Sequence, residues 1–447
     1  MPLFAAEALD HEQREVRRHF RRNFVAHSLE GGLFMGGVAF LHPQTVAPRM
    51  IERLGGPDWM IAAAPILQLV GFYVPSLFLT HRLERLAFLK PFVMGLGVLQ
   101  RLPYLLMGIA LLYARETDRW VLPCVMLTPL LSGLAGGVSI TAWREYVAKS
   151  IPAPRRASLW ACRFVLGGLL GVAAGQGVQL VLGSGGQGFG GQGSALSAYG
   201  VLHFGVLGGM LASYFVLAAT REPNLPSTRA GAEKSWWGYA RSMRRIIEND
   251  GRMAPYLASR ALFSGLYVVL PFLGLRALDV LHCSDGYLGR LLMCQMLGSV
   301  VGNLTAGVVG DRSGGRAVML LSQASSVVVA AAAPALHSAL GFELLFLALG
   351  WAIGLGNVGV ATLDLEMSGF AQRMSYQTLI GLSHLLGMVG AVTIATLVRQ
   401  LTPDFSVLAC IAAALNFGSF ALLARLAEPR RASLLLAETG RGDISAP

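Results

Sequence analysis

Ionisable side chains inside long apolar segments are the residues of this sequence that could carry chemistry. His27 and Glu30 are three residues apart, hence on one face of a helix, within the apolar segment 23–48. Arg260 lies within the apolar segment 255–276. A charge near the centre of a membrane helix costs roughly 2.5 to 3.5 kcal/mol on insertion scales, so each such residue needs a partner, a water-filled cavity or a function. We therefore regard these three residues as candidates for binding a solute or carrying a proton.

Three further candidates of this kind are Arg101, Arg163 and His384. Arg101 lies deepest in its apolar segment, where it could clamp a substrate or bond to backbone carbonyls or to Glu30. Arg163 lies near a helix end, and its long side chain can extend to the lipid headgroups. His384 is in the middle of its segment, where a histidine is either a packing residue with satisfied hydrogen bonds or part of a proton relay.

Twelve apolar segments position these residues. Each has about 20 residues, which is enough to cross a bilayer. They cover residues 23–48, 58–80, 91–113, 120–143, 158–182, 196–219, 255–276, 286–309, 316–336, 341–363, 375–398 and 405–426. With 54% hydrophobic residues, 14% charged residues and a mean hydropathy of +0.56, the chain is too apolar for an ordinary soluble protein. The sequence therefore predicts an all-α polytopic membrane protein with twelve transmembrane helices.

The apolar segments form two sets of six, separated by a charged stretch. The expected parts are a cytoplasmic N-terminal segment, a first six-helix bundle, a cytoplasmic linker, a second six-helix bundle and a cytoplasmic tail, at residues 1–22, 23–219, 220–254, 255–426 and 427–447. The linker contains a candidate amphipathic helix with Trp236, Trp237 and several arginines. This helix is either an interfacial connection or a regulatory, partner-binding element.

The basic residues indicate how the chain lies in the membrane. The net charge is +11, and 26 of the 36 Lys and Arg residues fall in segments that are cytoplasmic if the N terminus is, against six in the outside loops. By the positive-inside rule, both termini are cytoplasmic. This placement explains the positive charge without nucleic acid, which we exclude as a partner. Because 33 of the 36 basic residues are Arg, typical of a GC-rich bacterial genome, we expect a multi-pass protein of the bacterial inner membrane.

Two loops carry an acid–Arg pair at matching positions of the two halves. Placing Gln68 on Gln295, an offset of 227 residues, puts Glu84-Arg85 on Asp311-Arg312 without a gap. In both halves the pair ends an apolar helix, which indicates an internal repeat. The second loop is rich in glycines, which adopt positive φ at little cost and let the chain reverse.

The second loop resembles a family signature. The pattern G-x-x-x-D-R-x-G-x-R at residues 307–316 is similar to the loop between the eighth and ninth helices of major facilitator superfamily transporters, and residues 80–85 are similar to its counterpart between the second and third helices. The resemblance implies the major facilitator fold, with two pseudo-symmetric six-helix bundles, and a role for both loops in conformational switching. The loop residues concerned are Thr80, which replaces a Gly of the family, Glu84, Arg85, Gly307, Asp311, Arg312, Gly314 and Arg316.

The resemblance also implies that the first, fourth, seventh and tenth helices line a central cavity, which would bring His27 and Glu30 near Arg260. In one interpretation, Glu30, alone or with His27, accepts a proton while Arg260 binds an anionic substrate group or pairs with Glu30 to close the cytoplasmic side. In the other, Glu30 pairs permanently with Arg163 or Arg101 inside the first bundle. Both interpretations are open at the level of the sequence.

The expected function is secondary active transport of a small solute by alternating access, coupled to protons. Intramembrane Arg residues outnumber Glu, which favours an anionic or zwitterionic solute. The chain has no P-loop, so an ion gradient rather than ATP is the expected energy source. No catalytic set of side chains indicates an enzyme, and the five cysteines lack disulfide or metal-ligand spacing, so we expect no cofactor and no metal. We expect a monomer whose partners are the lipid bilayer and a small-molecule substrate.

Two other functions are open. The chain could move a lipid or another hydrophobic compound, in which case its cavity would open to the bilayer and its arginines would bind a headgroup. It could also be a membrane sensor or scaffold that transports nothing. In that case Glu30, Arg260 and Arg101 would saturate one another, and no cavity would be accessible.

Overall fold

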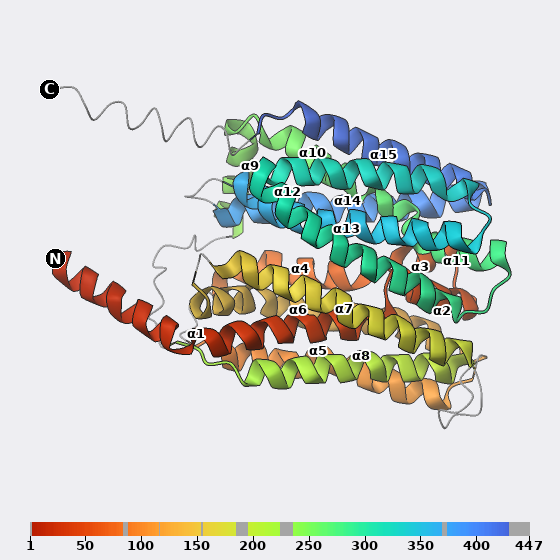
Figure 1. Cartoon of the computed structure of the whole chain (residues 1–447), viewed down its shortest axis with the longest axis horizontal. Coiled ribbons are helices and arrows are strands. Elements are labelled where there is room, and N and C mark those ends of the chain that lie inside the picture. Colours follow the sequence, from red (N-terminus) through yellow and green to blue (C-terminus); the bar gives the residue numbers. More distant parts are fainter. Residues whose placement is uncertain are drawn as a thin grey trace. The chain divides into compact units, whose positions relative to one another are not determined.

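The structure, a computed structural model, is helical (Figure 1). It describes residues 2–83, 88–115, 117–152, 155–184, 195–223, 236–368 and 373–428. These residues form helices joined by turns, and they contain no strand. The all-α class that the sequence predicts is confirmed.

The helices divide between two compact units. Unit 1 comprises Met1–Lys234, Leu270–Leu297 and His337–Glu343, and unit 2 comprises Ser235–Val269, Gly298–Leu336 and Leu344–Pro447. Unit 1 therefore includes two stretches from the half of the chain that the sequence assigns to the second bundle. The domain boundaries proposed from the sequence stay a prediction.

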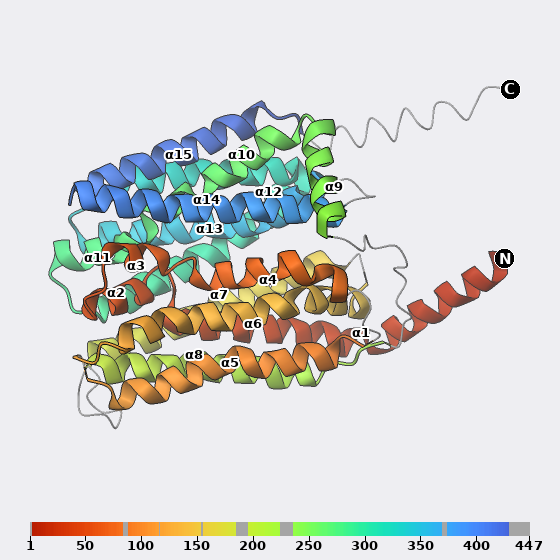
Figure 2. The same ribbon diagram turned by 180° about the vertical axis from the view of Figure 1, so that it is seen from behind.

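Unit 1 contains the helices of the first half of the chain and a hairpin from the second half. They are α1 (Pro2–Val38), η1 (Ala39–Leu41), α2 (Val46–Arg53), α3 (Asp58–Ala63), α4 (Leu67–Leu83), α5 (Lys90–Tyr113), α6 (Val121–Ser150), α7 (Arg156–Gly183), α8 (Ala195–Ala218), α11 (Leu270–Leu281) and α12 (Tyr287–Ala332) as far as Leu297. Glycines bring these helices close together: a Cβ on Gly133 of α6 would lie 2.4 Å from the carbonyl oxygen of Gln68 in α4. The short helices α2 and α3 lie beside α11 at the end of unit 1 away from the N terminus, as Figure 1 and Figure 2 show.

Unit 2 contains the other helices of the second half. They are α9 (Trp236–Asn249), α10 (Met253–Phe263), η3 (Ser264–Val268), the rest of α12, η4 (Ala333–Ala335), α13 (Ala339–Glu366) from Leu344 onward, α14 (Arg373–Leu401) and α15 (Phe405–Arg425). Met253, Tyr256 and Met319 lie in its core, each at most 1% exposed. The amphipathic α9 packs Met243 and Ile246 into this core and exposes arginines on its other face.

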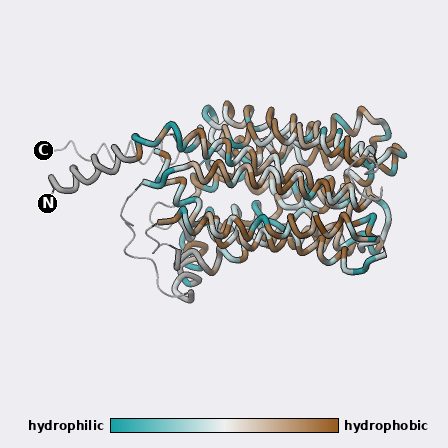
Figure 3. Tube along the Cα trace, turned by 90° about the horizontal axis from the view of Figure 1, so that it is seen from below, coloured by the Kyte–Doolittle hydropathy of each residue, from teal (hydrophilic) through white to brown (hydrophobic). Residues whose placement is uncertain are grey.

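Ten helices among the described residues are long and apolar enough to cross a membrane. Hydrophobic residues run along these helices, and hydrophilic residues gather near their ends and in the connections (Figure 3). The span Tyr287–Ala335 covers two predicted segments, because two helices meet at Gly314, whose φ of 83° and ψ of 171° are not helical. The segment predicted at 58–80 corresponds to α3 and the 17-residue α4. The count of twelve spans stays a prediction.

Gly298 allows α12 to pack against α13. A Cβ at this position would lie 1.9 Å from the carbonyl oxygen of Leu347, a backbone atom that cannot move aside cheaply. Gly298→Ala is therefore expected to destabilise the protein by about 1 to 3 kcal/mol, the usual cost of overpacking. The control is Gly307→Ala on the same helix, where the added Cβ would meet nothing within 4 Å; it should leave the thermal unfolding midpoint unchanged or raise it. Equal midpoints for the two variants would contradict the close packing at Gly298.

The turn between α9 and α10 carries an ion pair outside the candidate membrane spans. Arg252 donates hydrogen bonds to Asp250 from Nε to Oδ1 at 3.0 Å and from Nη2 to Oδ2 at 2.9 Å. These bonds lower the pKa of Asp250. The stabilisation is therefore present above the ordinary pKa of an aspartate and is lost as the pH falls through the lowered pKa.

Arg252→Gln is accordingly expected to lower the unfolding midpoint at neutral pH by an amount that disappears in acid. The pair is partly exposed, so its contribution is at most about 1 kcal/mol. Thermal unfolding of both proteins over a series of pH values measures the difference. A difference that stays constant down to a pH at which Asp250 is protonated would rule out the ion pair as its cause.

Candidate functional site

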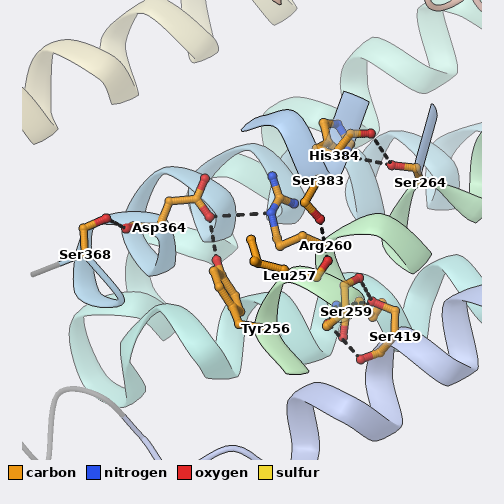
Figure 4. Close-up of polar contacts among 11 residues, drawn as sticks. Tyr256, Leu257, Ser259, Arg260, Ser264, Asp364, Ser368, Ser383, His384 and Ser419 are labelled. Carbon is orange, nitrogen blue, oxygen red and sulfur yellow. Dashed lines mark hydrogen bonds and ion pairs between the residues drawn. The ribbon is translucent and has the colours of Figure 1, made fainter. Parts of the chain in front are cut away.

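Arg260, Asp364 and Tyr256 form a buried polar cluster in unit 2 (Figure 4). Arg260 Nε lies 3.6 Å from Asp364 Oδ1, and the Tyr256 hydroxyl donates to the same oxygen at 2.5 Å. The Arg260 side chain is 4% exposed, whereas the Asp364 side chain is 18% exposed. The carboxylate is thus shared by a cation and a hydroxyl, and it is the more accessible partner of the ion pair.

Two helices position this cluster. Tyr256 and Arg260 are four residues apart on α10, so they lie on the same face of that helix. Asp364 lies in the last turn of α13, where the Ser368 hydroxyl donates to the Asp364 carbonyl oxygen at 2.5 Å and holds the helix end. The carboxylate therefore meets the guanidinium at the end of α13.

His384 of α14 is joined to the end of α10. The Ser264 hydroxyl lies 2.8 Å from His384 Nδ1 and 3.2 Å from the His384 carbonyl oxygen. The His384 ring also interacts with the backbone of Arg260. Two of the residues predicted for the site, Arg260 and His384, are therefore neighbours in unit 2 (Figure 4).

A buried hydrogen-bond network holds α10 next to Arg260. Ser259 and Ser419 each donate to the other's carbonyl oxygen, at 3.0 and 2.7 Å. Each hydroxyl oxygen also accepts a hydrogen bond from Gln323 Nε2, at 2.8 Å for Ser419 Oγ and 3.4 Å for Ser259 Oγ. All three side chains are at most 1% exposed. These hydrogen bonds join α10, α12 and α15 at the residue that precedes Arg260.

Glu30 and Arg163 form a buried ion pair in unit 1. Arg163 Nη1 donates to Glu30 Oε2 and, at 2.6 Å, to the carbonyl oxygen of His27. The guanidinium carbon also lies 4.7 Å from the ring centroid of Trp143 and 5.4 Å from that of Trp160. The Arg163 and Glu30 side chains are 6% and 9% exposed. Arg163 therefore lies among aromatic rings and the first helix, and it does not extend to the headgroups.

His27 and Arg101 are buried in unit 1 with other neighbours. The His27 ring packs against Tyr146 at a centroid distance of 5.3 Å, and neither ring nitrogen has a hydrogen-bond partner among the described residues. Arg101 donates to the carbonyl oxygens of Met210 and Gly97 at 2.7 and 2.6 Å. Arg101 is thus bonded to backbone carbonyls, which is one of the arrangements that the sequence leaves open.

The loop that follows Gly307 is fixed to two helix ends in unit 2. Gly314 takes a φ of 83°, which glycine adopts at little cost. The next residue, Gly315, donates its N–H to the Glu366 carboxylate at 3.2 Å. Arg316 donates to two carbonyl oxygens at the end of α15, at 3.1 and 2.7 Å. A cation near a helix C terminus is favourable, so this contact stabilises the start of the helix that follows the loop.

Lys90 makes the matching contact in unit 1. Its Nζ donates to the carbonyl oxygens of Ala218, the last residue of α8, and of Thr220, just after it, at 2.8 and 2.7 Å. In each half of the chain, a basic residue that follows the acid–Arg loop thus binds the end of the last helix of that half. This supports the internal repeat that the sequence indicates.

The other loop residues are placed only in part. Asp311 and Arg312 are exposed at the end of the first helix of α12. The backbone of Thr80 belongs to α4, and its side chain lies outside the described residues, as do Glu84 and Arg85. The switching role of these residues stays a prediction.

The contacts of two carboxylates, Asp364 and Asp285, were not predicted from the sequence. Neither Asp364 nor Tyr256 was among the residues predicted for the site. The signal for Tyr256 was its spacing of four residues from Arg260. Sequence reasoning also missed Asp285, which binds Arg49 and forms part of a cluster in unit 1. No short-range pattern joins Asp285 to Arg49, because 236 residues separate them.

The cluster in unit 2 has the chemistry to bind an anion and to carry a proton. A guanidinium binds a carboxylate or phosphate through parallel hydrogen bonds. A carboxylate that loses its cation partner in surroundings of low dielectric constant is more stable with a proton. Among the described residues, no group of three or more His, Cys, Asp or Glu side chains is placed to hold a metal ion.

Comparisons with known proteins give the fold. No protein-family model and no curated protein sequence matches the chain. A crystal structure of a mutant of the nucleoside transporter NupG aligns with it at a TM-score of 0.65 and 13% identity, covering 90% of this chain and 99% of its own. A second NupG crystal structure aligns at a TM-score of 0.58 and 16% identity, covering 91% of this chain and 100% of its own. A bacterial homologue of the human lysosomal transporter Spinster, inward-facing and unoccupied, aligns at a TM-score of 0.57 and 12% identity, covering 91% of this chain and 94% of its own. In agreement with the loop at residues 307–316, these alignments show that the chain has the fold of the major facilitator superfamily, a multi-pass membrane fold.

Proposed function

We propose that this protein is a secondary transporter of a small anionic or zwitterionic solute, coupled to protons and acting as a monomer in the bacterial inner membrane with both termini cytoplasmic. The observation that carries this proposal is the Arg260–Asp364 pair. Its guanidinium is almost fully buried, yet its carboxylate partner is 3.6 Å away, beyond hydrogen-bond distance, and is 18% exposed. Such a pair can exchange its carboxylate for that of a solute.

The proposed cycle follows from this exchange. An anionic group of the solute takes the place of Asp364 on Arg260 and forms the bidentate contact that guanidinium favours. Asp364 then lacks its cation and takes up a proton, while the Tyr256 hydroxyl keeps it in place at 2.5 Å. When the solute leaves, Arg260 attracts the carboxylate again and the proton is released. One proton therefore accompanies each solute molecule.

Glu30 is the second candidate for the proton acceptor. Its contact with Arg163 is direct, and the guanidinium is held in addition by the His27 carbonyl oxygen and two indole rings. Separating this pair would leave both charges buried, so it exchanges less readily than the pair in unit 2. We therefore propose that Glu30 and Arg163 stabilise unit 1 and that Asp364 couples transport to protons. His27 belongs with Glu30 to the second candidate site for the proton.

The switch loops belong to the same proposal. Gly314 turns the chain, and Gly315 and Arg316 attach the turn to the ends of α13 and α15. The exposed pair Asp311-Arg312 directly precedes this turn, and we propose that its contacts change as the transporter changes state. A charge reversal at Asp311 should impair transport with less effect on solute binding.

A thermal-shift screen of the purified protein tests the proposal. The compounds are organic anions, zwitterions, cations, sugars, lipids and the nucleosides that NupG carries by its name, each at two pH values. A ligand at 100 times its dissociation constant stabilises the folded state by about 2.7 kcal/mol, which is readily measured. We expect stabilisation by an anion or zwitterion that increases at the lower pH. The matched control is Arg290→Gln, which removes an Arg that pairs with Glu343 at 2.9 Å and should leave the stabilisation intact.

The other outcomes each point to a different function. Stabilisation by lipids alone would support transport of a lipid or hydrophobic compound. Stabilisation by neutral sugars or nucleosides, unchanged by pH, would contradict both the anionic solute and the proton. A folded protein that no compound stabilises, and that transports nothing, would favour a sensor or scaffold.

A further inference from the structure

One face of α1 is apolar and exposed in the turns that follow Arg22. Val25 and Leu29 are 56% and 42% exposed and lie four residues apart, hence on the same face of the helix. His27 and Glu30 are buried on the opposite face. The helix packs between α7 and α8 of unit 1 (Figure 1). An exposed apolar face on a candidate membrane span is a surface for lipid acyl chains.

The end of α8 adds to this exposed apolar surface. Phe215 is 67% exposed, and the N–H of Ala219 donates to its carbonyl oxygen at 3.2 Å, so the two residues are one turn apart. Arg22 Nε of α1 donates to the Ala219 carbonyl oxygen at 2.8 Å. This hydrogen bond joins α1 to the end of α8 at the level where both apolar faces end. It uses one of the five N–H donors of the guanidinium.

Three arginines continue the exposed face of α1 toward the N terminus. Arg18, Arg21 and Arg22 are exposed, and we call them the arginine stripe. Arg18 and Arg21 come seven and four residues before Val25, and Arg22 comes seven residues before Leu29, so all three lie on the face of these apolar residues. A helix face that changes from apolar side chains to guanidiniums within one turn is typical of the boundary between acyl chains and lipid headgroups.

The arginines of α9 have different surroundings. Arg241, Arg244 and Arg245 are also exposed and also lie within five residues of one another. Their face of the helix continues into Glu248, which pairs with Arg244 at 2.7 Å. The apolar face of α9 is opposite and packs into the core of unit 2. The α9 arginines therefore match the arginine stripe in number and charge but adjoin a carboxylate.

We propose that the arginine stripe binds the phosphate groups of anionic phospholipids whose acyl chains lie along Val25, Leu29 and Phe215. A guanidinium binds phosphate through parallel hydrogen bonds, and each basic residue near an anionic bilayer surface strengthens the attraction about fivefold. A zwitterionic phospholipid presents the same phosphate with a cation beside it, so the site favours lipids with a net negative charge. Because Arg22 also binds the end of α8, the bound lipid holds α1 and α8 at one depth in the membrane.

Native mass spectrometry of the purified full chain tests this lipid site. The protein is titrated with phosphatidylglycerol and with phosphatidylcholine of the same acyl chains. We expect the triple variant Arg18→Gln, Arg21→Gln, Arg22→Gln to bind phosphatidylglycerol at least about tenfold more weakly than the wild type, with unchanged binding of phosphatidylcholine. The matched control is the α9 triple variant Arg241→Gln, Arg244→Gln, Arg245→Gln, which removes the same charge and should bind phosphatidylglycerol as the wild type does.

A second variant carries the test if the triple variant does not fold. Arg18→Gln with Arg21→Gln keeps the bond from Arg22 to Ala219 and should still weaken phosphatidylglycerol binding about tenfold. Unchanged binding in the stripe variants, or an equal loss in the α9 variant, would overturn the proposal. A loss that occurs only in Arg260→Ala would also overturn it, because the lipid would then occupy the solute site. Since the titration needs no transported solute, its outcome is independent of the solute screen.

Discussion

Arg260→Ala is expected to abolish transport and to weaken solute binding about 100-fold or more. Arg260 is the buried cation of the proposed site. Removing one partner of a buried charge pair costs about 2 to 5 kcal/mol or more, and a 100-fold loss of affinity corresponds to about 2.8 kcal/mol. Solute binding is measured by calorimetry or thermal shift, and transport is measured in proteoliposomes. Arg260→Lys should retain weak binding, because an ammonium keeps the charge and loses the planar pair of donors.

A second variant separates binding from stability. Arg260→Ala leaves Asp364 as an uncompensated half-buried carboxylate, so the protein should also become less stable. Adding Asp364→Asn removes that charge and should restore most of the stability without restoring solute binding. If the double variant recovered binding as well, Arg260 would be a structural residue and the solute would bind elsewhere.

Breaking the Glu30–Arg163 pair is expected to have the largest effect on stability. Arg163→Ala should destabilise the protein by about 3 to 5 kcal/mol, because it leaves the Glu30 carboxylate buried without a cation. Glu30→Ala should be similar, because Arg163 would keep its carbonyl and indole contacts but lose its counter-charge. Chemical denaturation of the purified protein measures both effects.

The combination Glu30→Gln with Arg163→Met tests whether the pair is only structural. Removing both charges together should cost much less than removing either one, since no buried charge is left unpaired. The double variant should therefore fold and transport with its proton coupling intact. A stable double variant that transports without moving protons would transfer the coupling role from Asp364 to Glu30.

The sequence predicted the fold and the buried charges better than it predicted their partners. Long apolar segments and the loop around Gly314 require only local information, and the non-helical φ of Gly314 lies within the predicted turn. Glu30 and Arg260 were recognisable because an ion in an apolar segment is costly wherever it lies in the chain. Among the residues that pair with these buried charges, Arg163 was predicted as one of two alternative partners of Glu30, the other being Arg101.

The remaining partners depend on how helices pack, which a single sequence does not encode locally. Asp364 lies 104 residues after Arg260, and its position near a helix end made it resemble an interfacial charge. Arg49 and Arg53 have the spacing of ordinary outside-loop arginines, and only the packing of α11 against α2 brings Asp285, in the turn after α11, to them. The repeat at an offset of 227 residues places Asp285 on Asp58, but it gives neither Asp285 nor Asp364 a partner.

Proton uptake on solute binding tests the proposed coupling most directly. The purified protein in weakly buffered solution is mixed with the solute found in the screen, and the pH change is followed for wild type and for Asp364→Asn. The exchange at Arg260 predicts uptake of one proton per solute bound by the wild type and none by Asp364→Asn, which should still bind the solute. Equal uptake by both proteins, or solute binding by the wild type without any uptake, would contradict it.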